Sequence, residues 1–168
     1  MINFLEQLVA EWYEFNGYFV RRNVRVGRRD KGGHDGELDV VAFNPGTKHL
    51  VHVEPSMDAH SWEKREKRYS KKFEAGKKHI PGLFSGFDLG TDTKIEQIAV
   101  LLQGARSEIS GGRILLVEDL MKMICGALRN RSVLKRAVPE QYQLLRALQF
   151  AANYWELVDE KNIAKKTR

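Results

Sequence analysis

Hydrophobic and polar residues follow two different periods along the chain, and the switches between them predict the order of helices and strands. Residues 3–16 carry apolar side chains at helical spacing and end at an Asn-Gly pair, which is typical of a helix stop. Residues 18–54 alternate with a period of two around the turn-forming residues 44–48, which predicts a three-stranded antiparallel meander. Residues 61–80 place an apolar stripe opposite a row of lysines, which predicts a long amphipathic helix.

The second half of the chain continues this mixture of elements. Its pattern predicts strands at 94–103 and 112–118, and helices at 118–130 and 139–158. In the first half, the connection at 28–36 between the first two strands is predicted to be a mobile basic loop. The full order is then a helix, three strands, a helix, two strands and two helices. This order indicates an α/β fold in which helices flank a mixed central sheet, with further helices at the C-terminal end.

Length and composition fit one folded domain with a basic surface. The chain has 168 residues, of which 42% are hydrophobic, and it contains no internal repeat or linker. We therefore expect a single domain over residues 1–160, followed by a basic tail at 161–168. The excess of 28 Lys and Arg over 22 Asp and Glu favours phosphate polymers as partners.

The chain has a single cysteine, Cys125, which excludes an internal disulfide framework and a multi-cysteine zinc site. The first residues lack the pattern of a signal peptide, and the longest apolar runs are too short to cross a bilayer. We therefore predict a cytoplasmic protein that does not enter the membrane.

Two strands of the predicted meander each carry a carboxylate. Strand alternation places Asp39 on the opposite face from Leu38, so we expect this acid to face away from the core. The same count places Glu54 on one face of the third strand together with His52 and Ser56. If the two strands pair through the turn at 44–48, Asp39 and Glu54 converge at the end of the strands away from that turn.

Two close carboxylates repel one another unless a cation or a shared proton lies between them. Oxygen ligands of this kind suit Mg²⁺ or Mn²⁺, which keep several waters and accept phosphate oxygens from a substrate. His52 and Glu54 could instead bind a transition metal, but no second histidine has helpful spacing. The residues themselves therefore favour a Mg²⁺ or Mn²⁺ site and leave the ordinary alternative, an acidic strand surface, open.

The segments "FLEQLVAEWYEFNGYFV", "GELDVVAF" and "VHVEPS" together resemble the PD-(D/E)xK nuclease superfamily, which includes Holliday junction resolvases and Mrr-type restriction proteins. The resemblance covers about residues 3–80. It implies a restriction-endonuclease-like fold and hydrolysis of DNA phosphodiester bonds with Mg²⁺ or Mn²⁺. Asp39, Glu54 and the backbone carbonyl of Pro55 match the residues that hold the metal in that family. Glu6 is similar in placement to its helical glutamate, for which Glu11 is the substitute.

The chain departs from the family at Ser56, which occupies the position of the motif lysine. In the family that lysine is thought to orient or activate the attacking water. Ser56 can donate a hydrogen bond but carries no charge, so it can at most help to place water. Some family members recruit the basic residue from the following helix. Here Arg65, Arg68 and Lys72 flank the apolar stripe of that helix and can point back across the sheet, although an arginine cannot act as a base.

Several basic side chains of the first hairpin and of the 61–80 helix are candidates for contact with the phosphates of DNA. They are Arg28, Arg29, Lys31, Lys64, Arg65, Arg68 and Lys72. The missing motif lysine leaves an alternative from another class, a catalytically silent relative that binds DNA or another protein. A third reading is an acid-lined site for a phosphate ester that is not a nucleic acid. The sequence also leaves open whether the protein is a homodimer.

Overall fold

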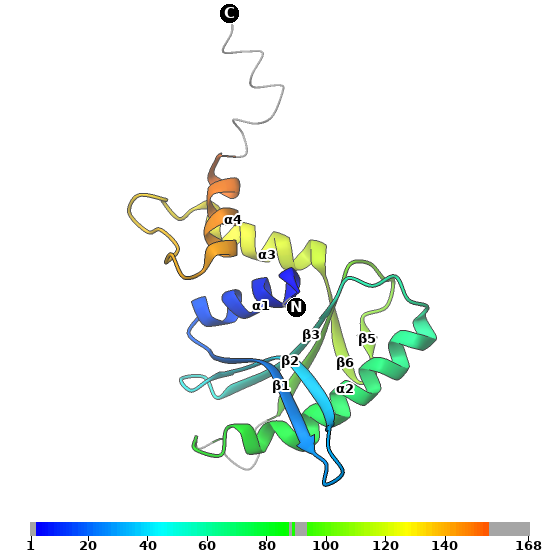
Figure 1. Ribbon diagram of the computed structural model, residues 1–168. Helices are drawn as coiled ribbons and strands as arrows, with labels where there is room; N and C mark the ends of the chain where they lie inside the picture. Colours follow the sequence, from blue (N-terminus) through cyan, green and yellow to red (C-terminus); the bar gives the residue numbers. More distant parts are fainter. Residues whose placement is uncertain (1–2, 88, 90–93, 155–168) are drawn as a thin grey trace, which may run out of the picture. The chain divides into compact units, whose positions relative to one another are not determined.

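The computed structural model describes residues 3–87, 89 and 94–154, and Figure 1 shows how their helices and strands are arranged. In chain order the elements are α1 (Phe4–Phe15), β1 (Phe19–Arg28), β2 (His34–Asn44), β3 (His49–Ser56), α2 (Trp62–Leu83), β4 (Ile95–Leu101), β5 (Glu108–Ile109), β6 (Gly112–Leu116), α3 (Val117–Arg129) and α4 (Gln143–Tyr154). Two compact units contain them, a sheet unit over 1–117 and a helical unit over 118–168.

The sheet unit is built on one mixed sheet with the strand order β1-β2-β3-β4-β6-β5. The first three strands form an antiparallel meander, which confirms the predicted pairing through the turn at 44–48. Helix α2 then crosses over to β4, which lies parallel to β3, and β6 lies parallel to β4. The predicted α/β class and the mixed sheet are therefore confirmed.

Helices cover both faces of the sheet, α1 on one face and α2 on the other (Figure 1). The side chain of Asn3 caps α1 by accepting a hydrogen bond from the backbone N–H of Leu5 at 3.0 Å. The apolar stripe of α2 is buried at Tyr69, Phe73 and Ile80, as the periodicity predicted. Consecutive residues of β2 and β3, which point to opposite faces of the sheet, are consequently buried, as they are in sheets covered on both sides.

Several predicted boundaries differ from the structure. The predicted basic loop at 28–36 is shorter, because Arg28 still pairs with His34 and only residues 29–33 connect the strands. Helix α2 continues past residue 80 through Pro81, and the guanidinium of Arg21 donates a hydrogen bond to the carbonyl of Leu83 in its last turn. The two-residue strand β5 was not predicted, because it is too short to show a period.

The helical unit contains α3 and α4 joined by an irregular segment. Gln149 is buried and organises that segment: its Oε1 accepts from the N–H of Val138 at 2.8 Å, and its Nε2 donates to the carbonyls of Arg131 and Arg136, both at 3.1 Å. Helix α4 begins at Gln143, four residues later than predicted. The end of that predicted helix and the predicted tail at 161–168 lie outside the described residues.

No helix in the described ranges is both long enough and apolar enough to span a membrane.

Candidate functional site

The carboxylates of Asp39 and Glu54 meet where β2 and β3 leave their paired region. The register pairs Val40 with Val53, so Asp39 and Glu54 are the next residues outward on their strands. The backbone N–H of Asp39 donates to Oε1 of Glu54 at 3.2 Å. The predicted convergence of these two acids is therefore confirmed.

The expectation that the acids face away from the core is wrong, because α2 covers the face on which they lie. Leu38 packs in one cluster with Val41 and Phe43, although regular alternation would place Leu38 on the opposite face from both of them. The neighbouring strand β1 is irregular beside this point: its residue Asn23, which lies between the partners of Leu38 and Val40, has a φ of 52°.

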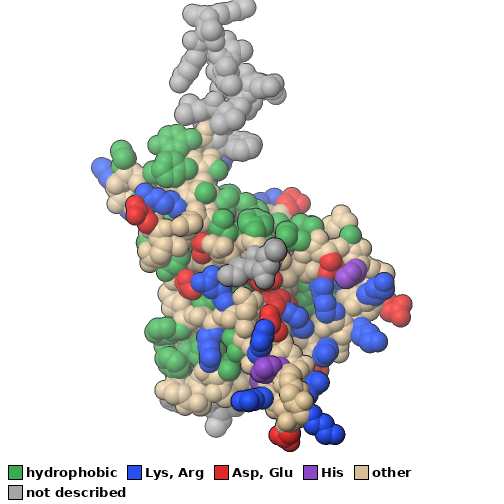
Figure 2. Space-filling view, viewed as in Figure 1, with side chains coloured by type: hydrophobic (Ala, Val, Ile, Leu, Met, Phe, Trp, Pro, Cys, Tyr) green, Lys and Arg blue, Asp and Glu red, His purple; other side chains and the backbone are tan. Residues whose placement is uncertain are grey.

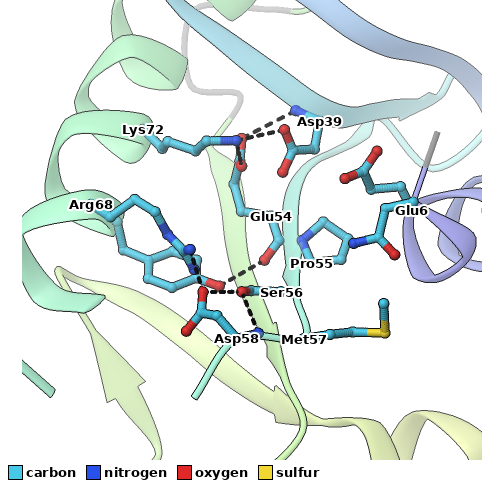
Figure 3. A pocket seen from close by; sticks show the side chains of 11 residues that line it. Glu6, Asp39, Glu54, Pro55, Ser56, Met57, Asp58, Arg68 and Lys72 are labelled. Atoms are coloured by element: carbon cyan, nitrogen blue, oxygen red, sulfur yellow. Dashed lines mark hydrogen bonds and ion pairs between the residues drawn. The ribbon is translucent and has the colours of Figure 1, made fainter. Parts of the chain in front are cut away.

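Lys72 brings a positive charge to the two acids. Its Nζ lies 2.5 Å from Oδ1 of Asp39 and also contacts Oε2 of Glu54 (Figure 3). About three turns of α2 separate it from the start of the helix, and its position beside the buried Phe73 aims it at the sheet. Of the basic residues that flank the apolar stripe, Lys72 is the one that reaches both acids.

Burial and mutual repulsion shift the protonation equilibria of this trio. Burial, followed by the charge of Glu54, raises the pKa of Asp39 to about 7. Burial also raises the pKa of Glu54, although Lys72 opposes the shift. For Lys72 itself, burial alone would lower the pKa, but the charges of Glu54 and Asp39 outweigh it and the pKa lies above its ordinary value. Lys72 is therefore an ammonium at neutral pH.

An open pocket of about 440 Å³ lies in front of these groups. Its lining comprises Asn3, Glu6, Asp39, Glu54, Pro55, Ser56, Met57, Asp58, Arg68, Tyr69 and Lys72. Glu6 reaches the pocket from α1, and its pKa is raised by partial burial and by the charge of Asp39. Glu11, the substitute for Glu6, does not line the pocket, and its carboxylate accepts from the amide of Gln7 at 2.9 Å.

Ser56 lines the pocket but belongs to a second polar cluster centred on Asp58. The hydroxyl of Ser56 and the guanidinium of Arg68 both donate to Oδ2 of Asp58 (Figure 3). Arg68 also lies over the ring of Tyr69, with 4.9 Å to its centroid. Burial opposes ionisation of Asp58, but the hydrogen bonds from Ser56, from the N–H of His60 and from Arg68 hold its pKa below the ordinary value. Sequence reasoning missed Asp58, because a loop aspartate shows no periodicity.

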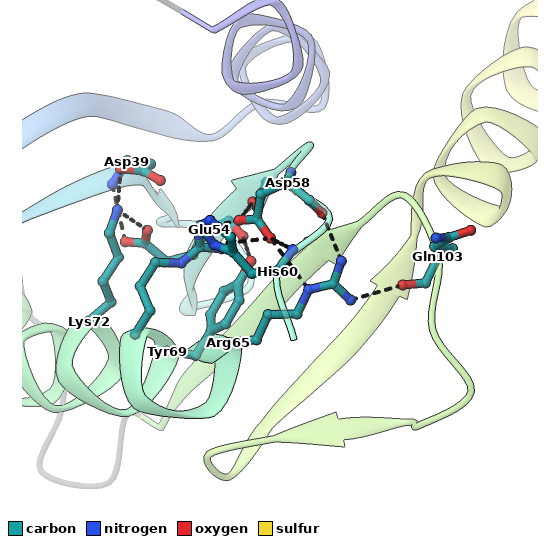
Figure 4. Close-up of polar contacts among 10 residues, drawn as sticks. Asp39, Glu54, Asp58, His60, Arg65, Tyr69, Lys72 and Gln103 are labelled. Atoms are coloured by element: carbon teal, nitrogen blue, oxygen red, sulfur yellow. Dashed lines mark hydrogen bonds and ion pairs between the residues drawn. The ribbon is translucent and has the colours of Figure 1, made fainter. Parts of the chain in front are cut away.

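Arg65 is buried behind the same cluster, with 6% of its surface exposed. Its Nη2 donates to the carbonyl of Asp58 at 2.7 Å, and its Nη1 donates to the carbonyl of Gln103 at 3.2 Å (Figure 4). This geometry favours a structural role for Arg65 over the predicted contact with phosphate. Through these two hydrogen bonds, Arg65 connects the loop after β3 with the loop after β4.

The remaining basic candidates lie on the surface. Arg28, Arg29, Lys31 and Lys64 are exposed. Figure 2 shows Lys and Arg side chains over the β1–β2 hairpin and α2, around a smaller group of acidic side chains. Arg29 is already paired with Asp35, at 3.0 Å. Surface charge of this kind attracts phosphate without reading sequence.

The donor atoms of the pocket fit a hard divalent cation. The side chains of Asp39 and Glu54 offer oxygen ligands only, and Pro55, whose carbonyl the resemblance implies as a ligand, lines the same pocket. The ammonium of Lys72 contacts both carboxylates, so the pair already holds one positive charge. Among the residues described, no group of three or more His, Cys, Asp or Glu is arranged to hold a metal. Two carboxylates are nevertheless sufficient for Mg²⁺, which takes its other ligands from water and substrate phosphate.

No protein-family model matches this chain, and no curated protein matches it either.

Proposed function

We propose that the protein is a metal-dependent DNA endonuclease of the PD-(D/E)xK type in which a lysine of α2 replaces the motif lysine. The observation that carries this proposal is the contact of the Lys72 ammonium with both Asp39, at 2.5 Å, and Glu54. An acid pair with one lysine, open to a pocket, reproduces the charges of the family's motif although Ser56 stands at its usual lysine position. The basic hairpin supports DNA as the partner.

Asp39, Glu54 and the carbonyl of Pro55 would hold Mg²⁺ or Mn²⁺. When bound, such an ion lowers the pKa of an attacking water and stabilises charge on the phosphate. Lys72 remains protonated because its pKa is raised, so it acts as a hydrogen-bond donor to the attacking water or to a phosphate oxygen and does not act as a general base. Glu6 lies across the pocket, where it can hold a second ion or orient a water.

Arg68 and Ser56 have supporting roles in this proposal. Asp58 fixes the guanidinium of Arg68 at the pocket wall, where a phosphate oxygen of the bound strand would find a positive charge. The hydroxyl of Ser56 is engaged with Asp58, so it supports the position of Arg68 and takes no part in activating water.

A catalytically silent DNA-binding or protein-binding domain is the second candidate, and one observation favours it. Lys72 already offsets the charges of Asp39 and Glu54, so the trio can be a stable ion-pair network without any metal. The two candidates differ in whether Mg²⁺ or Mn²⁺ competes with the ammonium for the carboxylates.

The decisive experiment is cleavage of supercoiled plasmid by the wild type and by Asp39→Ala, with Mn²⁺, Mg²⁺ or a chelator. Metal-dependent nicking that disappears in the variant supports the nuclease, provided that circular dichroism shows the variant folded. Plasmid binding without cleavage, and no Mn²⁺ binding by calorimetry, would support the silent domain.

A third reading, a site for another phosphate ester, is tested with the small diester bis(p-nitrophenyl) phosphate. Its hydrolysis without any cleavage of DNA would favour that reading. Sedimentation of the same preparations measures whether the protein is a homodimer.

A further inference from the structure

A buried chain of hydrogen bonds lies behind Glu54. Nε2 of Gln97 donates to the carbonyl of Phe73 at 2.8 Å and lies 3.3 Å from Nδ1 of His52. Nε2 of His52 lies 2.7 Å from Oε1 of Glu54. The chain thus links α2 and β4 to one carboxylate oxygen of the pocket. It also gives both ring nitrogens of His52 a partner, although this side chain, which the sequence correctly placed on the face of Glu54, is completely buried.

The partners of His52 determine which ring nitrogen carries the proton. A backbone carbonyl can only accept, so the atom of the Gln97 amide that meets the carbonyl of Phe73 must be the nitrogen. That same nitrogen faces Nδ1 of His52, which must therefore be the acceptor. The neutral ring consequently carries its proton on Nε2 and donates it to Glu54.

The orientation of the Glu54 carboxylate follows from these donors. Its Oε1 accepts two hydrogen bonds, one from His52 at 2.7 Å and one from the N–H of Asp39 at 3.2 Å. Rotation of the carboxylate would break both. Oε2 is thereby left as the oxygen that faces Lys72.

Gly76 makes room for this arrangement. A Cβ at position 76 would overlap Nδ1 of His52 and would lie 2.7 Å from its Cε1 and 3.2 Å from Nε2 of Gln97. The ring is buried and cannot move aside cheaply. A glycine in the middle of α2 costs helix stability, and this contact gives its physical reason.

We propose that His52 is a positioning residue, which Gln97 holds in the Nε2–H tautomer so that it fixes Glu54 with Oε2 presented to the cation site. The proposal rests on the proposed function in one respect, that Glu54 is a ligand of the divalent ion. Ligands of a metal are commonly held by such outer hydrogen bonds, and removal of one costs about 10- to 100-fold in metal affinity.

The first test is independent of any metal or activity. Two-bond ¹H–¹⁵N correlation spectra of the folded protein in chelator, assigned with the His52→Gln variant, report the tautomer of His52. We expect the pattern of a neutral ring protonated on Nε2. A ring protonated on Nδ1 would overturn the inference.

The second test compares Mn²⁺ affinity, measured by calorimetry, in matched variants. His52→Met removes the donor, and we expect the Kd to rise about 10- to 100-fold. His52→Gln keeps an N–H near the place of Nε2, and we expect it to recover part of the affinity. His49→Met is the control, because His49 lies on the same strand and bonds Tyr18 and Glu96 outside the pocket. Thermal unfolding of each variant verifies that it is folded.

The outcomes separate the two proposals. Equal Mn²⁺ affinity in the wild type and in folded His52→Met, together with abolished binding in Asp39→Ala, would overturn the role of His52 alone. No Mn²⁺ binding by the wild type would overturn the proposed function and this role together.

Discussion

The Nζ of Lys72 lies 2.5 Å from Oδ1 of Asp39, a residue 33 positions earlier in the chain, and it contacts Glu54 as well. The contact joins the middle of α2 to the point where β2 and β3 leave their paired region. It brings one ammonium and two carboxylates to the wall of a single pocket. Because the two acids come from adjacent strands and the lysine from the crossover helix, the trio depends on the whole β2–β3–α2 unit.

Replacement of Lys72 by methionine keeps an unbranched side chain that is one atom shorter and removes the charge. We expect DNA cleavage to fall by on the order of 10²-fold or more, because the variant lacks one preorganised donor to the reacting phosphate. The variant Lys77→Met is the matched control, since Lys77 is exposed on the same helix and pairs only with Glu74 among the ion pairs described. Plasmid nicking rates measure both. Equal losses of activity in the two variants would contradict a specific role for Lys72.

The stability of the protein should depend on pH through Asp39. Its pKa is about 7 when folded and about 3.9 in an unfolded chain, so between these values the folded protein binds the proton more tightly. Raising the pH from about 4 to about 7 therefore lowers the free energy of unfolding, by no more than about 4 kcal/mol from this residue.

The Asp39→Asn variant should lack this part of the pH dependence. Urea unfolding in chelator, at intervals between pH 4 and 8, measures the difference between wild type and variant. A difference that stays constant over this range would show that Asp39 is ionised throughout.

Asp58 should be important for stability although it lies in a loop. Asp58→Asn removes the charge that holds Arg68 and leaves the buried Arg65 with a weaker partner. We expect the free energy of unfolding to fall by about 2 kcal/mol, the size of a few hydrogen bonds to charged groups. Glu74→Gln is the control, because it weakens only an exposed ion pair on α2 and should change stability little. Chemical unfolding of both proteins gives the comparison.

The exposed basic residues of the hairpin should set the salt dependence of DNA binding. Replacement of Arg28 and Lys31 by glutamine should reduce the slope of log affinity against log salt by about 0.9 for each phosphate that the protein no longer neutralises. Fluorescence anisotropy with a labelled duplex over a salt series measures that slope. Lys122→Gln serves as a control, since Lys122 is exposed in the helical unit and pairs with Glu118. A slope equal to that of the wild type would show that Arg28 and Lys31 do not contact the phosphates of DNA.

Gly76→Ala should disturb the pocket from a distance. The added methyl group overlaps the ring of His52, and we expect a decrease in stability of about 1–3 kcal/mol together with reduced cleavage. Gly82→Ala in the same helix has no neighbouring atom within 4 Å of the new Cβ, so its stability should be unchanged or slightly higher. Melting temperatures of the two variants test the contact. A melting temperature of Gly76→Ala equal to that of the wild type would contradict it.

Local patterns in the sequence predicted most of the helices and strands and the meeting of the two acids. Strand periodicity and the turn residues at 44–48 predicted the β2–β3 pairing, and that pairing places Asp39 beside Glu54. Helical periodicity likewise predicted that Lys72 lies near the apolar stripe of α2. These features follow from backbone geometry within one element or one hairpin, which a short window of sequence contains.

The identity of the basic residue that meets the acids depends on long-range packing and could not be predicted from local patterns. Three basic residues have similar positions relative to the stripe: Arg65, Arg68 and Lys72. Because of the way α2 packs on the sheet, the two arginines contact Asp58. Lys72 instead contacts Asp39 and Glu54. The same packing buries His52 against Gly76. Such partners are far apart in sequence, and the place where a helix crosses a sheet is fixed by the fit of all their side chains, which no local period records.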